Sequence, residues 1–308
     1  MAFLFPGQGS QAVGMLAGFG ANPAVAEAVA AASGAIGLDI ASLVAEGPAE
    51  TLNLTVNTQP VMLACAVGFF QAYRAAGGPM PSAMAGHSLG EYSALVAAGA
   101  LPLSEAASLV RFRAEAMQQA VPVGQGGMAA VLGLAAQKVD EVCRGLSQPQ
   151  GVVEAVNFNA PDQTVIAGHL VAVEAACAAL KAAGAKRALM LPVSAPFHSS
   201  LLVPAAKALS DRLAQVDFSP VQVPVWHNLT AQPCGDAAAI RQALAAQARN
   251  PVLWTQTIEG LAKAGIATFV ECGPGKVLAG LVKRITPEAR VLNIFDQASL
   301  DACLEALQ

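Results

Sequence analysis

The chain has 308 residues, of which 55% are hydrophobic and 12% are charged, about half the usual ~25% share of charged residues. Its best apolar run, residues 61–70, is half the ~20 residues that a membrane-spanning helix needs, so we expect a core-rich soluble protein with no membrane segment. The net charge of −4 gives no sign of a nucleic-acid-binding surface.

The first 124 residues have the pattern of mixed strands and helices. In chain order we expect a strand over 1–5, helices over 24–32 and 61–74, a strand over 82–86, and helices over 91–98 and 104–120. The last helix has the clearest ends, because Ser104 is a plausible N-cap and Pro122 and Gly124 stop the helix.

A glycine-rich stretch at 124–127 marks a change to a more regular pattern. After it we expect a strand over 128–134, a helix over 136–146, strands over 152–158 and 163–167, a helix over 170–183 and a strand over 187–193. The order β-α-β-β-α-β is the ferredoxin-like arrangement. We therefore expect a ferredoxin-like subdomain, residues 125–196, inserted in a large domain made of residues 1–124 and 197–308.

The remaining residues return to a mixed α/β pattern. We expect a strand over 223–226, helices over 237–248 and 254–264, and a buried strand over 268–271. The fold class predicted from the whole sequence is therefore α/β.

The six cysteines are spread along the chain without a C-x-x-C pair, which favours reduced, mostly buried thiols in a cytoplasmic protein. The uncharged first 26 residues lack the basic segment of a secretory signal, and Pro6 and Gly7 interrupt their apolar start, so we expect mature protein there.

No metal-ligand spacing is present. The G-x-G-x-x-A match at 7–12 lacks the acidic residue of a dinucleotide site. We expect no metal and no tightly bound cofactor.

The segment Gly86-His87-Ser88-Leu89-Gly90 fits the nucleophile-elbow pattern G-x-S-x-G. The two glycines allow a tight strand-to-helix turn that exposes the Ser88 hydroxyl, and the next backbone N–H, from Leu89, can face a developing oxyanion. The strand expected before it and the helix expected after it supply the required context. The alternative is a glycine-bounded loop that contains an ordinary serine.

A serine nucleophile needs a base, and the chain has four histidines. His87 is expected to point away from its neighbour Ser88, His169 lies in the inserted segment, and His227 follows a strand. His198 is the leading candidate, because it lies in a loop where the inserted segment rejoins the large domain. The alternative is a loop histidine bonded to the backbone. No acid is placed to orient His198, so the sequence does not support a triad.

Arg113 falls near the middle of the apolar arc of the helix expected over 104–120, together with Met117. A guanidinium on a core face needs an anion, since an unpaired buried charge is costly. Arg113 alone favours a structural ion pair or an arginine that extends to solvent. Beside a serine elbow it also indicates a bidentate clamp for a substrate carboxylate.

Several motifs now occur in the order known for one family. They are segments 5–11, 58–60 and 86–91, Arg113, segment 157–159, His198, and segments 250–254 and 273–275. On these motifs the chain resembles the malonyl-CoA:acyl-carrier-protein transacylase family of bacterial type II fatty-acid synthesis over essentially its whole length. Each motif alone is modest, whereas the ordered set is specific.

The resemblance implies an α/β-hydrolase-like large domain with an inserted ferredoxin-like small domain. It implies transfer of malonyl from malonyl-CoA to the phosphopantetheine thiol of acyl carrier protein through an ester on the serine. The implied roles are nucleophile Ser88, base His198, oxyanion donors Gln11 N–H and Leu89 N–H, a histidine-orienting carbonyl on Gln247, a carboxylate clamp at Arg113, and a pocket with Gln59, Met117, Asn157, Asn159 and Phe197.

Phe197 favours malonyl over methylmalonyl as the acyl group. In related polyketide acyltransferase domains, phenylalanine at that position accompanies malonyl and serine accompanies methylmalonyl. An acidic carrier protein needs a basic surface, and the candidates are Lys186, Arg187, Lys276, Lys283 and Arg284. The alternative is that these five side chains are ordinary solvated surface charges with no role in docking. Nothing in the sequence demands more than a monomer.

Four other readings stay open at this point. The chain could load malonyl onto a polyketide carrier or onto the carrier subunit of malonate decarboxylase, with the same chemistry. It could also be a catalytically silent acyl-CoA-binding scaffold or a simple serine hydrolase. The joint presence of Ser88, His198 and Arg113 disfavours the silent scaffold. Arg113 and the paired Asn157 and Asn159 disfavour the simple hydrolase.

Overall fold

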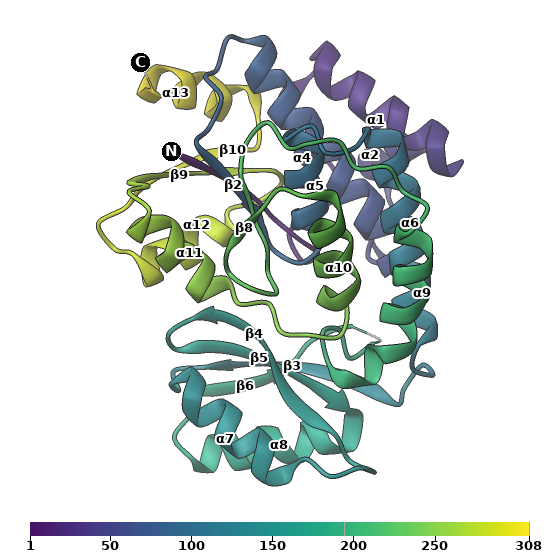
Figure 1. Ribbon diagram of the computed structural model, residues 1–308, viewed down its shortest axis with the longest axis vertical. Coiled ribbons are helices and arrows are strands. Elements are labelled where there is room, and N and C mark those ends of the chain that lie inside the picture. The colour runs from purple at the N-terminus through teal and green to yellow at the C-terminus, as the bar shows by residue number, and fades with distance from the viewer. Residues whose placement is uncertain (194, 308) are drawn as a thin grey trace.

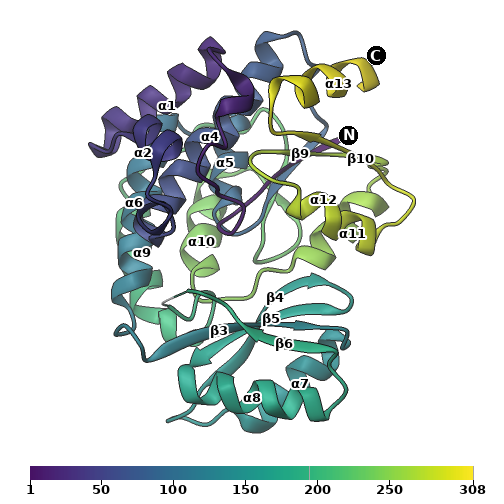
Figure 2. The same cartoon turned by 180° about the vertical axis from the view of Figure 1, so that it is seen from behind.

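The computed structural model describes residues 1–193 and 195–307. The described residues form two sheets that lie one above the other in Figures 1 and 2. The larger unit surrounds a six-stranded sheet, and the smaller unit is a four-stranded sheet with helices on one face. This arrangement confirms the α/β class expected from the sequence.

The six-stranded sheet has the order β10-β9-β1-β2-β7-β8. All neighbours are parallel except β7 and β8. Its strands are β1 (Ala2–Phe5), β2 (Ala83–Gly86), β7 (Val225–Trp226), β8 (Pro233–Cys234), β9 (Thr268–Cys272) and β10 (Arg290–Ile294). The central strands β1 and β2 are buried along their whole length, as expected of a parallel sheet covered on both faces.

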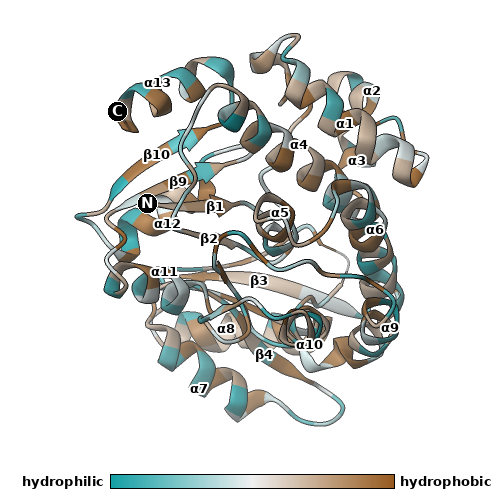
Figure 3. Cartoon of the chain, turned by 45° about the horizontal axis from the view of Figure 1, so that its top comes forward, coloured by the Kyte–Doolittle hydropathy of each residue, from teal (hydrophilic) through white to brown (hydrophobic). Residues whose placement is uncertain are grey.

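Helices pack around this sheet. They are α1 (Pro23–Ile36), α2 (Ile40–Glu46), α3 (Ala49–Leu52), α4 (Thr55–Ala75), α5 (Gly90–Ala97), α6 (Leu103–Gln119), α9 (Val203–Leu213), α10 (Ala237–Gln247), α11 (Trp254–Lys263), α12 (Val277–Ile285) and α13 (Gln297–Leu307), with 3-10 turns at Ala17–Phe19 and Ser200–Leu202. Helix α4 is the core helix, since nearly all its residues are buried and it contacts α1 and α6. Figure 3 shows hydrophobic colour on the central strands and on α5, and more hydrophilic colour on outer helices such as α7 and α13.

The four-stranded sheet has the order β4-β5-β3-β6, and its strands are antiparallel. Its elements follow the chain as β3 (Gly126–Leu132), α7 (Ala136–Leu146), β4 (Val153–Ala160), β5 (Gln163–His169), α8 (Leu170–Ala182) and β6 (Arg187–Met190). Helices α7 and α8 cover the face that points away from the larger unit (Figure 1). The other face therefore lies towards the larger unit.

The N-cap predicted at Ser104 is wrong. Helix α6 begins at Leu103, its N-cap is Pro102, and no side chain caps it. The Ser104 residue lies inside the first turn, and its carbonyl accepts from the Ser108 hydroxyl. Proline at 102 cannot donate a backbone hydrogen bond and its fixed φ suits the entry to a helix, so the helix starts earlier than the serine indicated.

The six cysteines are free thiols, and all but Cys234 are buried. Within the described residues no single helix is long and apolar enough to cross a membrane, and only α1 and α2, bent by 114° at their junction, meet the length and composition test when joined.

Candidate active site

Ser88 stands on a tight turn between β2 and α5. Its φ of 51° lies in the left-handed region, where non-glycine residues are uncommon and where strain often marks a functional site. The flanking glycines are required: a Cβ on Gly86 would lie 1.9 Å from the backbone of Gly90, and one on Gly90 would lie 2.0 Å from the Phe5 carbonyl oxygen. The turn therefore fits between β1, β2 and α5 only with glycine at both positions.

Asn228, which follows β7, holds this turn from the neighbouring strand. Its Oδ1 accepts from the Ser88 N–H at 2.6 Å, and its Nδ2 donates to the Gly86 carbonyl at 2.6 Å. The side chain is fully buried. It thus satisfies two backbone groups that the irregular turn would otherwise leave unpaired in the core.

His198 faces Ser88 from the loop that follows the small unit. Its Nε2 lies 2.7 Å from the Ser88 Oγ, and its Nδ1 lies 2.8 Å from the Gln247 carbonyl oxygen. Because a carbonyl only accepts, Nδ1 is assigned the proton and Nε2 is free to accept the Ser88 proton. Burial and the nearby Arg113 guanidinium lower the pKa of His198 to about 3, which keeps the ring neutral.

Arg113 is 1% exposed and reaches the same place from α6. It donates from Nη1 to Gln59 Oε1 at 2.7 Å, and from Nη2 to Gln247 Oε1 at 2.8 Å and to Ser88 Oγ at 3.1 Å. Tyr92 lies beneath it, with its ring centre 5.5 Å from the Arg113 Cζ. Among the described residues no carboxylate forms an ion pair with Arg113. The guanidinium is therefore buried, held by neutral oxygens, and open to an anion from outside.

These three side chains share one cavity of about 120 Å³ between the two units. Its lining residues are Gln8, Gln59, His87, Ser88, Leu89, Arg113, Met117, Met128, Asn157, Leu191, Val193, Phe197 and His198. A wider pocket of about 580 Å³ shares Gln8 and Val193 with it and is lined mostly by apolar side chains. The cavity is thus a small chamber lined by both polar and apolar side chains, next to a broader pocket.

The structure brings most of the expected residues to this cavity: Ser88, Leu89, Arg113, His198, Gln59, Met117, Asn157 and Phe197. Gln247 reaches Arg113 and His198 without lining it. Asn159 does not line the cavity, which differs from the expectation. His87 lines the cavity, but its ring faces residues other than Ser88, as expected: Nε2 lies 2.7 Å from Asn159 Oδ1, and the ring centre lies 5.4 Å from that of Trp254.

The glutamine of the N-terminal loop that lines the cavity is Gln8 and not Gln11. The Gln11 side chain turns outward, where its Oε1 accepts from the Gly9 N–H and its Nε2 donates to Asn53. The expectation that Gln11 lies beside the oxyanion is therefore replaced by Gln8. Both glutamines lie in one short loop, and the sequence does not state which way that loop faces.

Sequence reasoning also missed Asn228, Glu91, His227 and the apolar residues that the small unit contributes. Glu91 stands in the segment 86–91 but received no role, whereas Asn228 and His227 meet that segment only through chain separations above 100 residues. The general signal for Glu91 was present, since an acid on the buried face of α5 needs a partner.

The five candidate docking cations are exposed, and none lines the cavity. Arg284 pairs with Asp162 and Gln163, and Lys283 donates to the Ala289 carbonyl. The Lys276 ammonium lies 4.4 Å from the Phe295 ring centre. These three therefore have partners within the chain. Lys186 directly precedes β6, and Arg187 is the first residue of that strand.

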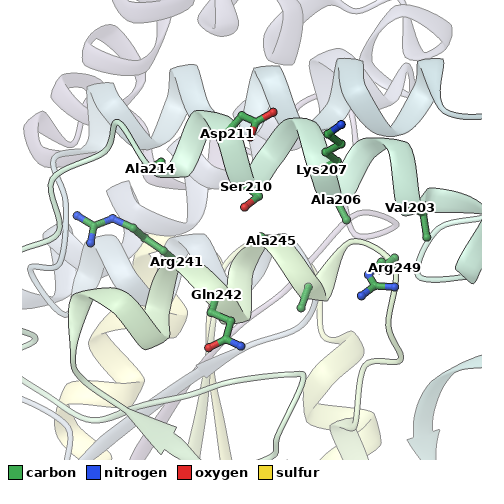
Figure 4. Close-up of a pocket in the computed structure, with 11 residues that line it drawn as sticks. Val203, Ala206, Lys207, Ser210, Asp211, Ala214, Arg241, Gln242, Ala245 and Arg249 are labelled. Carbon is green, nitrogen blue, oxygen red and sulfur yellow. The ribbon is translucent and has the colours of Figure 1, made fainter.

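A groove of about 690 Å³ lies elsewhere, between α9 and α10 (Figure 4). Lys207, Arg241 and Arg249 are among its lining residues, whereas Ser88, His198 and Arg113 are not. The described residues contain no group of three His, Cys, Asp or Glu side chains that could hold a metal ion.

Known proteins resemble this chain over nearly its whole length. Residues 2–295 match the family model described as acyl transferase domain. The chain is 51% identical over 304 residues to the malonyl CoA-acyl carrier protein transacylase of Salmonella typhimurium, and 48% identical over 305 residues to that of Escherichia coli strain K12, with at least 98% of each chain covered.

Solved structures agree over the full length. The acyl-carrier-protein S-malonyltransferase of Burkholderia pseudomallei superposes with a TM-score of 0.97 at 55% identity and 99% coverage of both chains. A structure described as a type II PKS acyl-carrier protein in complex with its malonyl-transacylase gives a TM-score of 0.97 at 47% identity, again with 99% of both chains covered.

Proposed function

This chain belongs to the acyl transferase domain family, and from that premise we propose that it transfers a malonyl group from malonyl-CoA to the phosphopantetheine thiol of acyl carrier protein, which supplies fatty-acid synthesis. One observation carries the choice of acyl group. A buried arginine, which has no acidic ion-pair partner in the described part of the chain, shares a cavity with a serine–histidine pair. That cavity suits an acyl thioester whose far end is a carboxylate.

The first half-reaction loads the enzyme. Ser88 Oγ attacks the thioester carbonyl carbon while His198 Nε2 takes the hydroxyl proton. The C–O bond forms, the C–S bond breaks, and the proton passes from His198 to the coenzyme A sulfur. The Gln247 carbonyl stabilises the imidazolium that exists between these steps. The product is a malonyl ester on Ser88.

The second half-reaction reverses this sequence with a new thiol. His198 takes the proton of the phosphopantetheine S–H, and the sulfur attacks the ester carbonyl carbon. The C–O bond to Ser88 breaks and the proton returns to Ser88 Oγ. Because one acyl group leaves before the other substrate reacts, the mechanism is ping-pong.

The oxyanion of each tetrahedral intermediate needs two N–H donors. Leu89 supplies one, because its N–H begins α5 directly after the nucleophile and the residue lines the cavity. Gln8 replaces Gln11 as the second donor, since it is the residue of the N-terminal loop in the cavity. Both donors would be backbone groups, which need no reorganisation during the reaction.

Arg113 would hold the malonyl carboxylate through paired N–H···O bonds. In the free enzyme its Nη atoms are held by Gln59 and Gln247, so the guanidinium is fixed before the substrate arrives. Met117 and Phe197 close the cavity with apolar surface. The small volume limits the room for water, which protects the ester from hydrolysis.

We propose that the two units are two domains, one made of residues 1–124 and 197–308 and the other of residues 125–196. The acceptor approaches the cavity where these two units face each other. We also propose that the chain acts as a monomer. The candidate carrier-docking cations remain Lys186, Arg187, Lys276, Lys283 and Arg284.

The free buried thiols support a cytoplasmic location.

A polyketide carrier is a second candidate acceptor. The observation in its favour is the 47% identity to a malonyl-transacylase solved with a type II PKS acyl-carrier protein. The chemistry at Ser88 is the same for both carriers, so only the acceptor differs.

The test is a transfer assay. Enzyme, malonyl-CoA and an acyl carrier protein of fatty-acid synthesis are mixed, and the mass of the carrier is followed. We expect malonyl on the carrier that bears phosphopantetheine and none on the same carrier without it. A parallel arm uses a polyketide carrier, and faster transfer to that carrier would favour the second candidate. Failure to load any carrier would reject the transferase function.

A further inference from the structure

Glu91 is a fully buried acid three residues after the nucleophile, and the reaction just described does not use it. Its Oε1 lies 2.6 Å from His227 Nδ1, and its Oε2 accepts from the Asn228 N–H and from Gln247 Nε2, both at 2.9 Å. Three donors therefore converge on its two oxygens. Only a side chain that accepts at both ends satisfies all three, which a carboxylate does.

The Gln247 side chain is the link between this acid and Arg113. Its Nε2 faces two acceptors, Glu91 Oε2 at 2.9 Å and the Ser88 carbonyl at 3.0 Å. Its Oε1 faces Arg113 Nη2 at 2.8 Å. A flipped amide would place an NH₂ group against the guanidinium and an oxygen against a carboxylate. Glu91 and the Ser88 carbonyl thus fix one orientation of the amide.

This orientation decides how Arg113 is presented to the cavity. The guanidinium is held by two amide oxygens, from Gln59 and Gln247, and both contacts are buried. If the Gln247 oxygen is lost, Nη2 keeps only its 3.1 Å contact with the Ser88 hydroxyl. A carboxylate that pairs with two N–H groups depends on the plane of the guanidinium, whereas an acyl group without a carboxylate does not.

His227 holds the acid in turn. It is 1% exposed, it lies in the loop after β7, and its ring contacts the Glu91 carboxylate. Burial lowers the pKa of His227 and the Glu91 carboxylate raises it, with a net shift upward. Because a carboxylate only accepts, Nδ1 is assigned the proton and donates to Glu91. The chain of contacts runs from His227 through Glu91 and Gln247 to Arg113.

We propose that the Gln247 side-chain amide is a positioning group for Arg113, held in a single orientation by the buried Glu91–His227 pair, and that this chain of contacts makes the site selective for an acyl group that carries a carboxylate. The proposal rests on the proposed malonyl transfer. It concerns the Gln247 side chain, which is separate from the backbone carbonyl that orients His198.

The test compares single-turnover loading of Ser88 by malonyl-CoA and by acetyl-CoA, followed by mass. Gln247→Met keeps the shape and the backbone carbonyl but removes both side-chain hydrogen-bonding groups. We expect the malonyl-to-acetyl ratio of kcat/KM to fall by about tenfold, in the range of one lost hydrogen bond to a charged group. Arg113→Ala, measured in parallel, sets the largest fall that loss of the clamp produces.

Thr257→Val is the matched control. Thr257 is equally buried, its hydroxyl donates to the Leu253 carbonyl within α11, and it contacts neither Arg113 nor Glu91 in the hydrogen bonds described above. The substitution also replaces a buried polar side chain with an apolar one of similar shape. We expect an unchanged ratio. An equal fall in this control would mean that the ratio reports general destabilisation, and would overturn the proposal.

His227 provides the second pair of variants. His227→Phe removes the donor to Glu91, and we expect the ratio to fall in the same direction, by about threefold. His227→Asn keeps an N–H donor near the position of Nδ1, and we expect the wild-type ratio. If both variants lower the ratio equally, the charge of His227 matters and its hydrogen bond does not, which contradicts the positioning role.

The outcomes distinguish a failure of the proposed function from a failure of the positioning proposal. Wild-type protein that takes up no malonyl rejects the proposed function. Wild-type protein that loads malonyl, together with a Gln247→Met variant that folds and keeps the wild-type ratio, overturns the positioning proposal and leaves the transferase function intact. Thermal unfolding of each variant establishes that it is folded.

Discussion

His198 is oriented by a backbone carbonyl, from Gln247, where many serine enzymes use a carboxylate. A carbonyl dipole stabilises the imidazolium less than a full negative charge does, and the Arg113 guanidinium next to the ring opposes its protonation. Burial and Arg113 together lower the pKa of His198 to about 3. The base is therefore ready in its neutral form over a wide pH range, and its proton is held only briefly.

This pKa predicts the pH dependence of Ser88 loading. A histidine with its usual pKa near 6.5 would lose base function below that pH, whereas His198 should keep the rate of loading nearly constant from pH 8 to 5. Single-turnover loading by acetyl-CoA measures it. Arg113→Ala removes a neighbouring positive charge, raises the pKa of His198, and should move the acid limb upward. An acid limb near pH 6.5 in the unmodified protein would contradict this account of the base.

Single residues also set the limit of what the sequence predicts. Local patterns single out Ser88, His198 and Arg113, which share one cavity: a glycine-bounded turn, a junction loop and a cation on an apolar arc. They do not single out Gln8 or the Glu91–His227 contact, because these depend on which way a loop faces and on residues 136 positions apart. Such contacts are set by tertiary packing, which no local pattern encodes.

The turn between β2 and α5 is the element on which the site depends. The Gly90 Cα lies so close to β1 that an added Cβ would be 2.0 Å from the Phe5 carbonyl oxygen, a backbone atom that cannot move away without disturbing the central sheet. Gly280 offers a matched contrast. It lies in α12, where an added Cβ would meet nothing within 4 Å.

We predict opposite effects for alanine at these two glycines. Gly90→Ala should lower the free energy of unfolding by about 3 kcal/mol or more, because overpacking against backbone forces the sheet or the helix to shift. Gly280→Ala should raise it by about 0.5–1 kcal/mol, since alanine favours the helix interior over glycine. Urea denaturation at one pH measures both. Equal effects would show that the close approach at Gly90 does not constrain the turn.

The elements differ in how far the sequence predicts them. Helix α7 is found at the expected residues, because its apolar positions repeat at helical spacing and the segment is bounded by turns. Helices α9 and α13 and strand β10 were not expected. Helix α9 packs on α6 and α10, β10 pairs with β9, and α13 packs on β10. Packing on neighbouring elements, which no local pattern encodes, therefore stabilises them.

At the scale of the whole molecule, the reaction site lies where two sheets face each other across a seam. Ser88 and Arg113 come from the larger unit, Met128 and Asn157 come from the four-stranded sheet, and His198 lies where the chain returns. Chain order predicted an insertion in this place, but the facing of the two units is a property of the folded molecule. The shortage of charge in the sequence also gains a meaning here, because one of few cations is buried where an anionic acyl group would bind.

The central claim is that Ser88 carries the malonyl group during transfer, and intact-protein and peptide mass spectrometry tests it most directly. The protein is incubated with malonyl-CoA in the absence of a carrier protein. We predict a gain of one malonyl mass, located on the peptide that contains Ser88 and lost when a phosphopantetheine thiol is added. Ser88→Ala should gain nothing. Absence of the adduct in the unmodified protein, or an equal adduct in Ser88→Ala, would contradict the account.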